Sequence, residues 1–389
     1  MSNTWKIYML TIISFVVGTS QLVIVGILNK VAASVGVSVS TAGQLISVFA
    51  LANAVGTPIV MVTLAKWNQR KQLLLALVII LLGIVSTIAL PGFGFLMVAR
   101  IILGVGTGVF VVNSYSIAAK LAAPGHRAAA MSNVSIGFSA STVFGIPIGV
   151  IVTTAFDWKM NFWILGVLSL VALYLVFRII PSTEAETPVP LRQQLALLKN
   201  RKIAIALCVS FVMFTSYSAV NTFITPILLA ITPMGAQELS IILFILGLAS
   251  LVGAKSGGIL ADRIGTARTL VGCMTLQAIT LVLVSLIFGS VSIVSLLLLL
   301  FWTIGVWIFG PTQNFNLLSI APDASGIMLS LNSSFTQFGF AAGAAVGGIT
   351  MSSWSTMGIT WVGAAAVALG AIIAAVAFDF SRTSSVTQD

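Results

Sequence analysis

Twelve long runs of apolar residues follow one another along the chain, separated by short gaps that contain glycine, proline or charged residues. A helix needs roughly 20 predominantly apolar residues to cross the hydrocarbon core of a bilayer. The runs cover about residues 7–28, 41–64, 72–90, 94–118, 128–154, 160–180, 203–228, 238–260, 269–287, 291–316, 325–350 and 355–379. This pattern predicts an all-α membrane protein with twelve transmembrane helices.

One gap is longer than the others and divides the runs into two groups of six. Residues 181–202 read PSTEAETPVPLRQQLALLKNRK, a segment rich in proline and charge. We therefore predict a first bundle over residues 1–180, a central cytoplasmic loop over 181–202 and a second bundle over 203–389. Within this loop, residues 191–198 could form a short amphipathic helix on the membrane surface.

The two halves resemble each other when the chain is shifted by 198 positions. The coincident positions are Ala123 and Ala321, Pro124 and Pro322, Ser132 and Ser330, Ser141 and Gly339, Gly145 and Gly343, and Gly149 and Gly347. Small residues four apart let helix backbones approach closely. A parallel repeat of six spans predicts two pseudo-symmetric six-helix bundles, an arrangement typical of transporters.

The composition supports a membrane protein and excludes several other classes. Charged residues make up 7% of the chain, against roughly 25% in soluble proteins. This excludes a soluble enzyme, a nucleic-acid-binding protein and a disordered chain. The chain has 18 Lys and Arg residues. With both termini in the cytoplasm, only Lys30 and Lys159 fall on the outer side of the membrane, and Arg100 and Lys255 lie within predicted spans. The others fall on the cytoplasmic side. This bias predicts a multi-pass cell-membrane protein with both termini cytoplasmic.

Catalytic and metal-dependent chemistry has little support in the sequence. The two cysteines lie in separate apolar runs, and the single histidine, His126, falls in a predicted loop, so neither a disulfide framework nor a metal cluster is expected. No P-loop motif is present. The acidic residues fall in loops or at helix ends, at Asp157, Glu184, Glu186, Glu238, Asp262, Asp323, Asp379 and Asp389. We expect no cofactor, no enzymatic activity and no carboxylate at the membrane midplane.

Five segments match motifs of one membrane-protein family. They are AGQLISVFAL at 42–51, R-x-x-x-G-x-G from Arg100 to Gly106, GIPIG at 145–149 preceded by Gly137, GILADRIG at 258–265, and IAPD at 320–323. With them the chain resembles the major facilitator superfamily over nearly its whole length. More narrowly, it resembles the drug:proton antiporter branch that includes bacterial purine, nucleoside and arabinose efflux proteins. The resemblance implies the major facilitator fold and transport by alternating access.

Two departures from the family pattern bear on proton coupling. The loop at residues 65–71 reads AKWNQRK, which keeps the basic end of the family motif but lacks its acid. Gln21 stands where many relatives carry a glutamate in the first span. A glutamine can hydrogen-bond a ligand but cannot carry a proton near neutral pH. The resemblance therefore implies proton antiport, whereas Gln21 leaves uncoupled facilitated efflux as an alternative.

Charged and helix-breaking residues are candidates for gating or coupling, because charge within a membrane is costly and usually functional. The resemblance implies a coupling or gating role for Arg100 and a gate at Asp262 and Arg263. The simpler explanations are bonding of backbone carbonyls by Arg100 and solvation of the loop pair. Lys255 could reach the membrane interface or attract a ligand in a cavity. For the interrupted fifth run we expect helix-interface geometry, set by Gly145, Pro147 and Gly149.

Uncharged polar residues near the predicted midplane are the candidates for substrate binding. Amides, Tyr and Trp offer donors, acceptors and stacking faces without fixed charge, which suits neutral heteroaromatic or polyhydroxylated ligands. Hydrogen bonding between helices is the alternative role. The candidates are Gln21, Asn53, Asn113, Tyr217, Asn221, Trp302, Trp307, Gln313, Asn332 and Gln337, with Tyr115 nearby.

These observations favour a monomeric secondary transporter. Its expected partners are a small-molecule substrate, the lipid bilayer and protons, and no nucleic acid. Purine bases or nucleosides come first as substrates, with sugars and hydrophobic drugs as rivals. A non-transporting receptor or scaffold would usually carry a long tail or soluble domain, and only about ten residues follow the last run. A membrane-embedded enzyme would need clustered histidines or acids, and the sequence has none.

Overall fold

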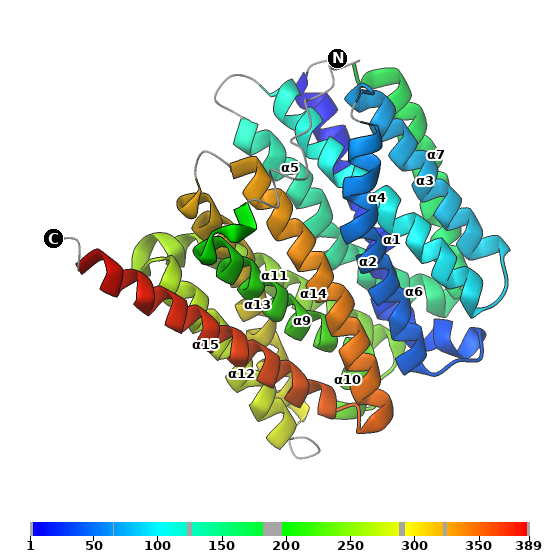
Figure 1. The fold of residues 1–389 in the computed structure, drawn as a ribbon. Coiled ribbons are helices and arrows are strands. Elements are labelled where there is room, and N and C mark those ends of the chain that lie inside the picture. The colour runs from blue at the N-terminus through cyan, green and yellow to red at the C-terminus, as the bar shows by residue number, and fades with distance from the viewer. Residues whose placement is uncertain are drawn as a thin grey trace. The chain divides into compact units, whose positions relative to one another are not determined.

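The computed structural model describes residues 3–64, 66–122, 127–181, 197–287, 292–321 and 325–386, and the regular elements within them are all helices (Figure 1). Within those residues, eleven helices are long and apolar enough to cross a membrane. The predicted span over residues 325–350 is not among these eleven. Its helix is 29 residues long, but it carries Ser, Asn, Thr, Gln and Gly along its length, which makes it less apolar. The prediction of an all-α membrane protein is confirmed.

The helices follow the predicted runs closely. The first half contains α1 (Asn3–Ser34), α2 (Val39–Thr63), α3 (Gln69–Ala89), α4 (Phe93–Leu121), α5 (Arg127–Ala140), the π-helical turn η1 (Ser141–Gly145), α6 (Ile146–Ala155) and α7 (Trp158–Ile179). The second half contains η2 (Leu197–Lys199), α9 (Arg201–Thr222), α10 (Ile224–Ile231), α11 (Ala236–Ile264), α12 (Thr266–Leu286), α13 (Ser292–Ile320), α14 (Ser325–Ser353) and α15 (Gly358–Val386).

Two of the predicted runs are interrupted, and each interruption precedes a proline. The fifth run changes from α5 to α6 through η1, just before Pro147. The seventh run breaks at Phe223, which has φ −109° and ψ 21° and separates α9 from α10. Proline has no backbone N–H and clashes with the preceding turn, so the helix widens or breaks there. At the start of α10 the missing group is the backbone N–H of residue 226. A residue other than proline at this position would donate that N–H to the carbonyl of Thr222.

Local signals explain where several helices begin. Ser38 caps α2 by accepting the Thr41 N–H at 3.0 Å, and Asn68 caps α3 by accepting the Lys71 N–H at 2.8 Å. The helices α4 and α12 instead follow Gly92 and Gly265, with φ of 95° and 87°. Such positive φ values suit glycine and allow a sharp change of direction between spans.

The chain divides into two compact units. Unit 1 comprises Met1–Pro188 and Met234–Phe244, and unit 2 comprises Val189–Pro233 and Ile245–Asp389. Our boundaries at 1–180, 181–202 and 203–389 stay a prediction. Several predicted features lie outside the described residues, namely most of the central loop with Glu184, Glu186 and Arg192, most of the proposed 191–198 helix, His126, Asp323 and Asp389.

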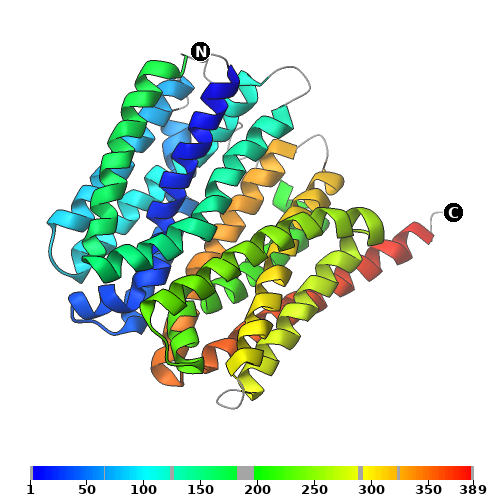
Figure 2. The same cartoon turned by 180° about the vertical axis from the view of Figure 1, so that it is seen from behind.

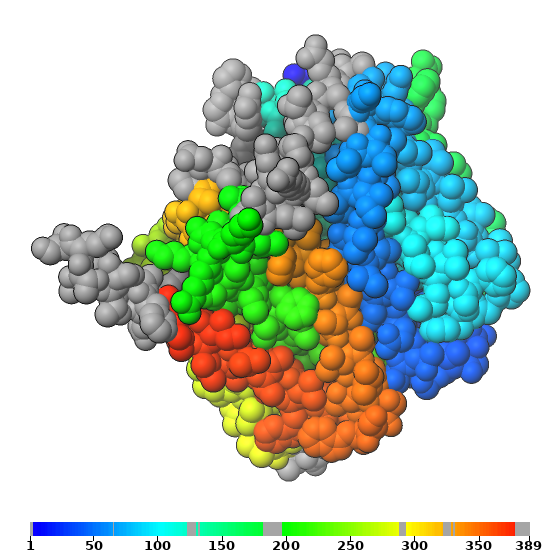
Figure 3. Space-filling view, viewed as in Figure 1, coloured from blue at the N-terminus to red at the C-terminus, as the bar shows by residue number. Residues whose placement is uncertain are grey.

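Each unit is held together by a small set of helix pairs (Figures 1 and 2). In unit 1, α1 packs against α5, α2 against α4, and α3 against both α4 and α7. In unit 2, α9 packs against α14 and α15, and α12 packs against α13 and α15. One face of unit 2 shows α14 (orange), α9 (green) and α15 (red) side by side (Figure 3). The first helix of each group of six therefore packs against the fifth.

Candidate functional site

Arg100 is the largest buried charge in unit 1. Its side chain is 2% exposed, and one terminal nitrogen donates to the Ser20 carbonyl at 3.3 Å. The guanidinium carbon lies 5.5 Å from the centroid of the Phe162 ring. The second terminal nitrogen has no hydrogen-bond partner among the described residues. Arg100 thus joins α4 to α1 through the carbonyl of Ser20, the residue before Gln21, and to α7 through the ring of Phe162.

The other unit 1 candidates lie on α1, α2 and α4. Gln21 is half-buried on α1. Asn53 and Asn113 are buried, and Asn113 donates to the Val109 carbonyl at 2.9 Å and contacts the Met61 sulfur at 3.6 Å. A Cβ atom built on Gly108 would lie 2.9 Å from the Asn53 Oδ1. Both asparagines therefore sit where α2 and α4 approach each other.

The glycines of the R-x-x-x-G-x-G segment face two different neighbours. A Cβ on Gly104 would overlap the Phe49 carbonyl of α2, and a Cβ on Gly106 would lie 2.9 Å from the Ile80 side chain of α3. Glycine at both positions lets α4 approach two helices at once. This part of the motif has a packing explanation in the structure, in addition to the burial of Arg100.

The fifth-span motif forms a close seam with α1. A Cβ on Gly145 would lie 2.5 Å from the Thr19 Oγ1, and a Cβ on Gly149 would overlap the Val23 side chain. Pro147 lies in the first turn of α6, between these two positions. The geometry supports interface packing for Gly145, Pro147 and Gly149, whereas a role in gating stays a prediction.

The equivalent seam in unit 2 is formed by α14 against α9. Cβ atoms on Gly339 and Gly347 would lie 2.6 Å from the Phe211 carbonyl and 2.9 Å from the Ala219 carbonyl, and one on Gly343 would overlap the Thr215 carbonyl. These are the positions that coincide with Ser141, Gly145 and Gly149 after the shift of 198. The sequence repeat therefore corresponds to a repeated helix pairing, but here the glycines face backbone atoms.

A chain of neutral hydrogen bonds crosses unit 2, from α13 to α9 and on to α14. Gln313 donates to the Ser210 hydroxyl at 2.9 Å, which donates to the Asn332 Oδ1 at 2.7 Å, and the Asn332 amide donates to the Asn314 Oδ1 at 2.9 Å. Asn316 donates to the Gln313 Oε1 at 3.4 Å. We refer to Ser210, Gln313, Asn314, Asn316 and Asn332 as the amide chain. It joins two predicted site residues, Gln313 and Asn332, through a serine.

An aromatic cluster lies next to the amide chain along α9. The rings of Tyr217 and Trp302 stack, with centroids 5.8 Å apart and an interplanar angle of 26°. Phe340 meets Tyr217 edge-on at 5.6 Å and stacks on Phe214 at 5.5 Å. The buried indole nitrogen of Trp302 has no hydrogen-bond partner in the described part of the chain. Tyr217 and Trp302, predicted separately, are direct neighbours.

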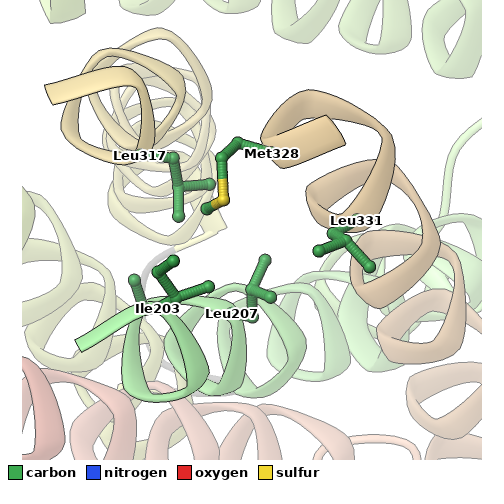
Figure 4. Close-up of a cluster of buried hydrophobic side chains, with 6 residues drawn as sticks. Ile203, Leu207, Leu317, Met328 and Leu331 are labelled. Carbon is green, nitrogen blue, oxygen red and sulfur yellow. The ribbon is translucent and has the colours of Figure 1, made fainter. Parts of the chain in front are cut away.

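On the other side of the amide chain, an apolar cluster fills the space between the ends of α9, α13 and α14 (Figure 4). Leu317 and Met328 point toward each other above Ile203 and Leu207 of α9, with Leu331 beside them. Going along α9 from its start, the side chains that pack against it form first the apolar cluster, then the amide chain and then the aromatic cluster. The spacing of three or four residues from Ile203 through Leu207 and Ser210 keeps these layers on one helix face.

In unit 2, three predicted site residues take no part in these clusters. Asn221 lies near the end of α9 and is half-buried, as is Gln337 on α14. Trp307 lies toward α11, where a Cβ on Gly253 would be 2.9 Å from the Trp307 Cβ. Sequence reasoning also missed members of the amide chain and of the aromatic cluster. Ser210 lies seven residues before Tyr217, two helical turns along the same face, so helical periodicity could have found it.

The loop-motif residues lie at helix ends. Asp262 and Arg263 are exposed in the last turn of α11, and Lys255 is exposed about two turns earlier. The corresponding loop after α2 lacks an acid and is held by amides. Gln72 donates to the carbonyls of Leu64 at 2.9 Å and Trp67 at 3.0 Å. The gating role of Asp262 and Arg263 stays a prediction.

Carboxylates are scarce wherever side chains are described. Asp157 precedes α7, Glu238 lies in the first turn of α11, and Asp262 lies in its last turn. Asp379 falls late in α15, where side chains are outside the description. No group of three or more His, Cys, Asp or Glu residues that could hold a metal is found within the described ranges.

Comparison with known proteins assigns the family. A family model described as Major Facilitator Superfamily matches residues 10–331. The chain belongs to the major facilitator superfamily. The MFS-type transporter YbcL of Bacillus subtilis (strain 168) is 44% identical to it over 389 residues, covering 100% of this chain and 99% of the relative.

Solved structures of the same fold support this assignment. A bacterial homologue of the human lysosomal transporter Spinster is 15% identical with a TM-score of 0.75, covering 98% of this chain and 97% of its own. A D-xylose–proton symporter is 16% identical with a TM-score of 0.77 and 96% coverage of both chains. The human organic anion transporter MFSD10 is 17% identical with a TM-score of 0.70, covering 95% and 98%. At these identities the likeness shows the fold.

These comparisons confirm the superfamily resemblance, the fold of two six-helix bundles and a multi-pass membrane protein. They also show that the chain is an MFS-type transporter and not an enzyme. The drug:proton antiporter branch, the substrate, the direction of transport, the cell membrane and the orientation of the termini stay predictions.

Proposed function

We propose that this transporter exports a small neutral solute across the cytoplasmic membrane by alternating access, with a purine base or nucleoside as the first candidate. The observation that carries the neutral-solute proposal is the amide chain beside the stacked Tyr217 and Trp302. Amides, hydroxyls and aromatic faces recognise polar heteroaromatic or polyhydroxylated molecules without fixed charge. The choice of purines and of export rests on the branch resemblance.

The driving force is proposed from the same resemblance to be the proton gradient. Uncoupled facilitated efflux is the second candidate, and a specific observation favours it. The described carboxylates are at helix ends, and the first-span position of the family glutamate is Gln21. A carrier that couples to protons needs a group that titrates and is reached from both sides. Arg100, buried next to Ser20, does not supply one near neutral pH.

Transport by loaded vesicles tests both proposals. Inverted membrane vesicles containing the protein receive labelled adenine, a nucleoside, arabinose or a dye, with and without a protonophore. We expect faster uptake of adenine or the nucleoside than in vesicles without the protein. When the protonophore is added, the vesicles should no longer accumulate the solute above its outside concentration. Faster movement of arabinose or the dye alone would replace the purine proposal with sugar or multidrug efflux.

The energy source is read from the same vesicles. If uptake never exceeds equilibration, with or without the proton gradient, proton coupling is wrong and facilitated efflux holds. Accumulation that is unchanged after the proton gradient collapses would contradict both mechanisms and indicate another energy source. If no solute moves faster than in control vesicles, the exporter proposal for these solutes fails. A control variant, Leu369→Ala, changes an exposed position on α15 outside the amide chain and the aromatic cluster. It should transport like the parent protein, which controls for expression and insertion.

A further inference from the structure

Two arginines lie together at one end of the α3–α7 pair in unit 1. Arg70 is in the first turn of α3 and Arg178 is in the last turn of α7. The two helices pack against each other along their length (Figures 1 and 2). Arg70 donates to the backbone carbonyl of Phe177, the residue next to Arg178. The two guanidinium groups therefore belong to one corner of unit 1.

Each arginine rests on an aromatic ring of α7. The guanidinium carbon of Arg70 lies 5.3 Å from the Phe177 ring centroid, and that of Arg178 lies 5.8 Å from the Tyr174 centroid. Arg178 also donates to the Tyr174 hydroxyl at 3.4 Å. Cation–π contact fixes the planes of the guanidinium groups but leaves most of their N–H donors unused. We call Arg70, Arg178, Tyr174 and Phe177 the basic–aromatic corner.

A structural role explains only part of this arrangement. The Phe177 carbonyl is among the last four of α7, which have no partner within the helix, so Arg70 caps that end. One N–H suffices for that bond, and the Arg70 Nε is buried with no hydrogen-bond partner among the described residues. Among the described residues, Arg178 contacts only the exposed Tyr174, through the long hydrogen bond and the ring. Because the Arg70 Nε is buried, the donors left for a ligand are the other terminal N–H groups of Arg70 and Arg178, which make no further hydrogen bond to the described residues.

The surroundings of the corner are basic and apolar. Lys71 follows Arg70 and is exposed. Tyr174 is 60% exposed and Phe177 is 58% exposed, and both lie on a helix whose outward face is apolar. The described carboxylates are on α11 or at the opposite end of α7. Glu184 and Glu186 follow in the sequence, within residues 182–196 that are not described.

We propose that the basic–aromatic corner binds the phosphate headgroup of an anionic phospholipid. The planar donors of arginine fit phosphate oxygens in pairs. Exposed Tyr and Phe rings at the end of a membrane-spanning helix lie where headgroup and acyl chain meet. A free phosphate ion would use the donors but not the exposed rings, so the aromatic surface favours a lipid.

The test measures lipid binding to the full-length protein purified in a neutral detergent. Retention of phosphatidylglycerol is compared with that of phosphatidylcholine of the same acyl chains by native mass spectrometry. We expect tighter binding of phosphatidylglycerol, and a loss of roughly tenfold to thirtyfold in its affinity in the Arg70→Gln/Arg178→Gln double variant. Arg268→Gln is the matched control, because Arg268 is exposed in the first turn of α12 of unit 2.

Several outcomes would overturn the proposal. Equal binding of the two lipids would remove the headgroup preference. An equal loss in Arg268→Gln would show general attraction to a basic protein. Displacement of the lipid by millimolar inorganic phosphate would indicate an ion site instead.

A second measurement uses the parent protein, in case the double variant does not fold. Photoactivatable phosphatidylglycerol should crosslink to peptides from the first turn of α3 and the last turn of α7. Crosslinks confined to other helices would contradict the assignment.

Discussion

The two units repeat one helix arrangement but fill it with different chemistry. In unit 1 the buried polar centre is Arg100, a cation held by one carbonyl and one aromatic ring. In unit 2 it is the amide chain, neutral and connected across three helices, with Tyr217 stacked on Trp302 beside it. The repeated helix arrangement therefore accommodates either set. We infer that unit 2 supplies more of the ligand recognition and that Arg100 serves the conformational change.

The seams between the first and fifth helices differ in a similar way. Gly145 and Gly149 face side-chain atoms of Thr19 and Val23. Gly339, Gly343 and Gly347 face backbone carbonyls of α9. A side chain can rotate away from an added methyl group, whereas a backbone carbonyl in a helix cannot. At Gly145 and Gly149 the seam of unit 1 is therefore tolerant, although Gly137 before them faces the Thr11 carbonyl. The three corresponding positions in unit 2 are strict.

The largest expected effect comes from adding one methyl group to each seam. Gly343→Ala should destabilise the protein by about 2–3 kcal/mol, because the methyl group meets the Thr215 carbonyl. Gly149→Ala should cost near zero, since the Val23 side chain can move and alanine favours the helix by about 1 kcal/mol. Thermal unfolding of the two variants in detergent measures this difference. Equal destabilisation would remove the distinction between the seams.

Arg100→Gln tests whether the buried cation serves the conformational change. We expect the maximal transport rate to fall about tenfold, with little change in the substrate concentration at half-maximal rate, because a charged hydrogen bond is worth about 1.5–3 kcal/mol. Trp302→Phe should do the opposite: the substrate concentration at half-maximal rate should change, and the maximal rate should change little. A shared pattern in both variants would contradict the division of roles.

Breaking the amide chain should have a moderate effect. Gln313→Leu removes the donor to the Ala206 carbonyl and to the Ser210 hydroxyl, both buried. We expect a loss of about 1–2 kcal/mol in stability. Gln337→Leu, on α14 but outside the chain, should cost less than about 0.5 kcal/mol. Unfolding temperatures of the pair decide this, and similar losses would show that no connected network exists.

The smallest effect on stability is expected from Gln21→Glu, but it changes the response to pH. A carboxyl group at this position can take up and release a proton, which an amide cannot. Transport by the variant should depend more strongly on pH than transport by the parent protein. The check is initial rate from pH 5.5 to 8.5, and superimposable profiles would exclude Gln21 from the coupling argument.

Much of the fold could be predicted because it follows from hydrophobic run length and glycine spacing. The described helices lie close to the predicted runs, and the shift of 198 identified the seams of both units. The break at Phe223 was missed, since the signal is one proline in an otherwise apolar run. The site was predicted as separate polar residues. Their grouping depends on which helix faces meet, and Ser210, which joins Gln313 to Asn332, is too common a residue to stand out.

The π-helical turn at Ser141–Gly145 has a consequence for insertions and deletions in this chain. A π turn bonds each N–H to the carbonyl five residues back, so it holds one residue more than an α turn. Removing one residue there would let the segment close as ordinary α-helix and keep α6 facing α1. The same deletion in the middle of α14 would rotate everything after it by about 100° and turn the glycines away from α9. The fifth span thus contains a spare residue, and the eleventh does not.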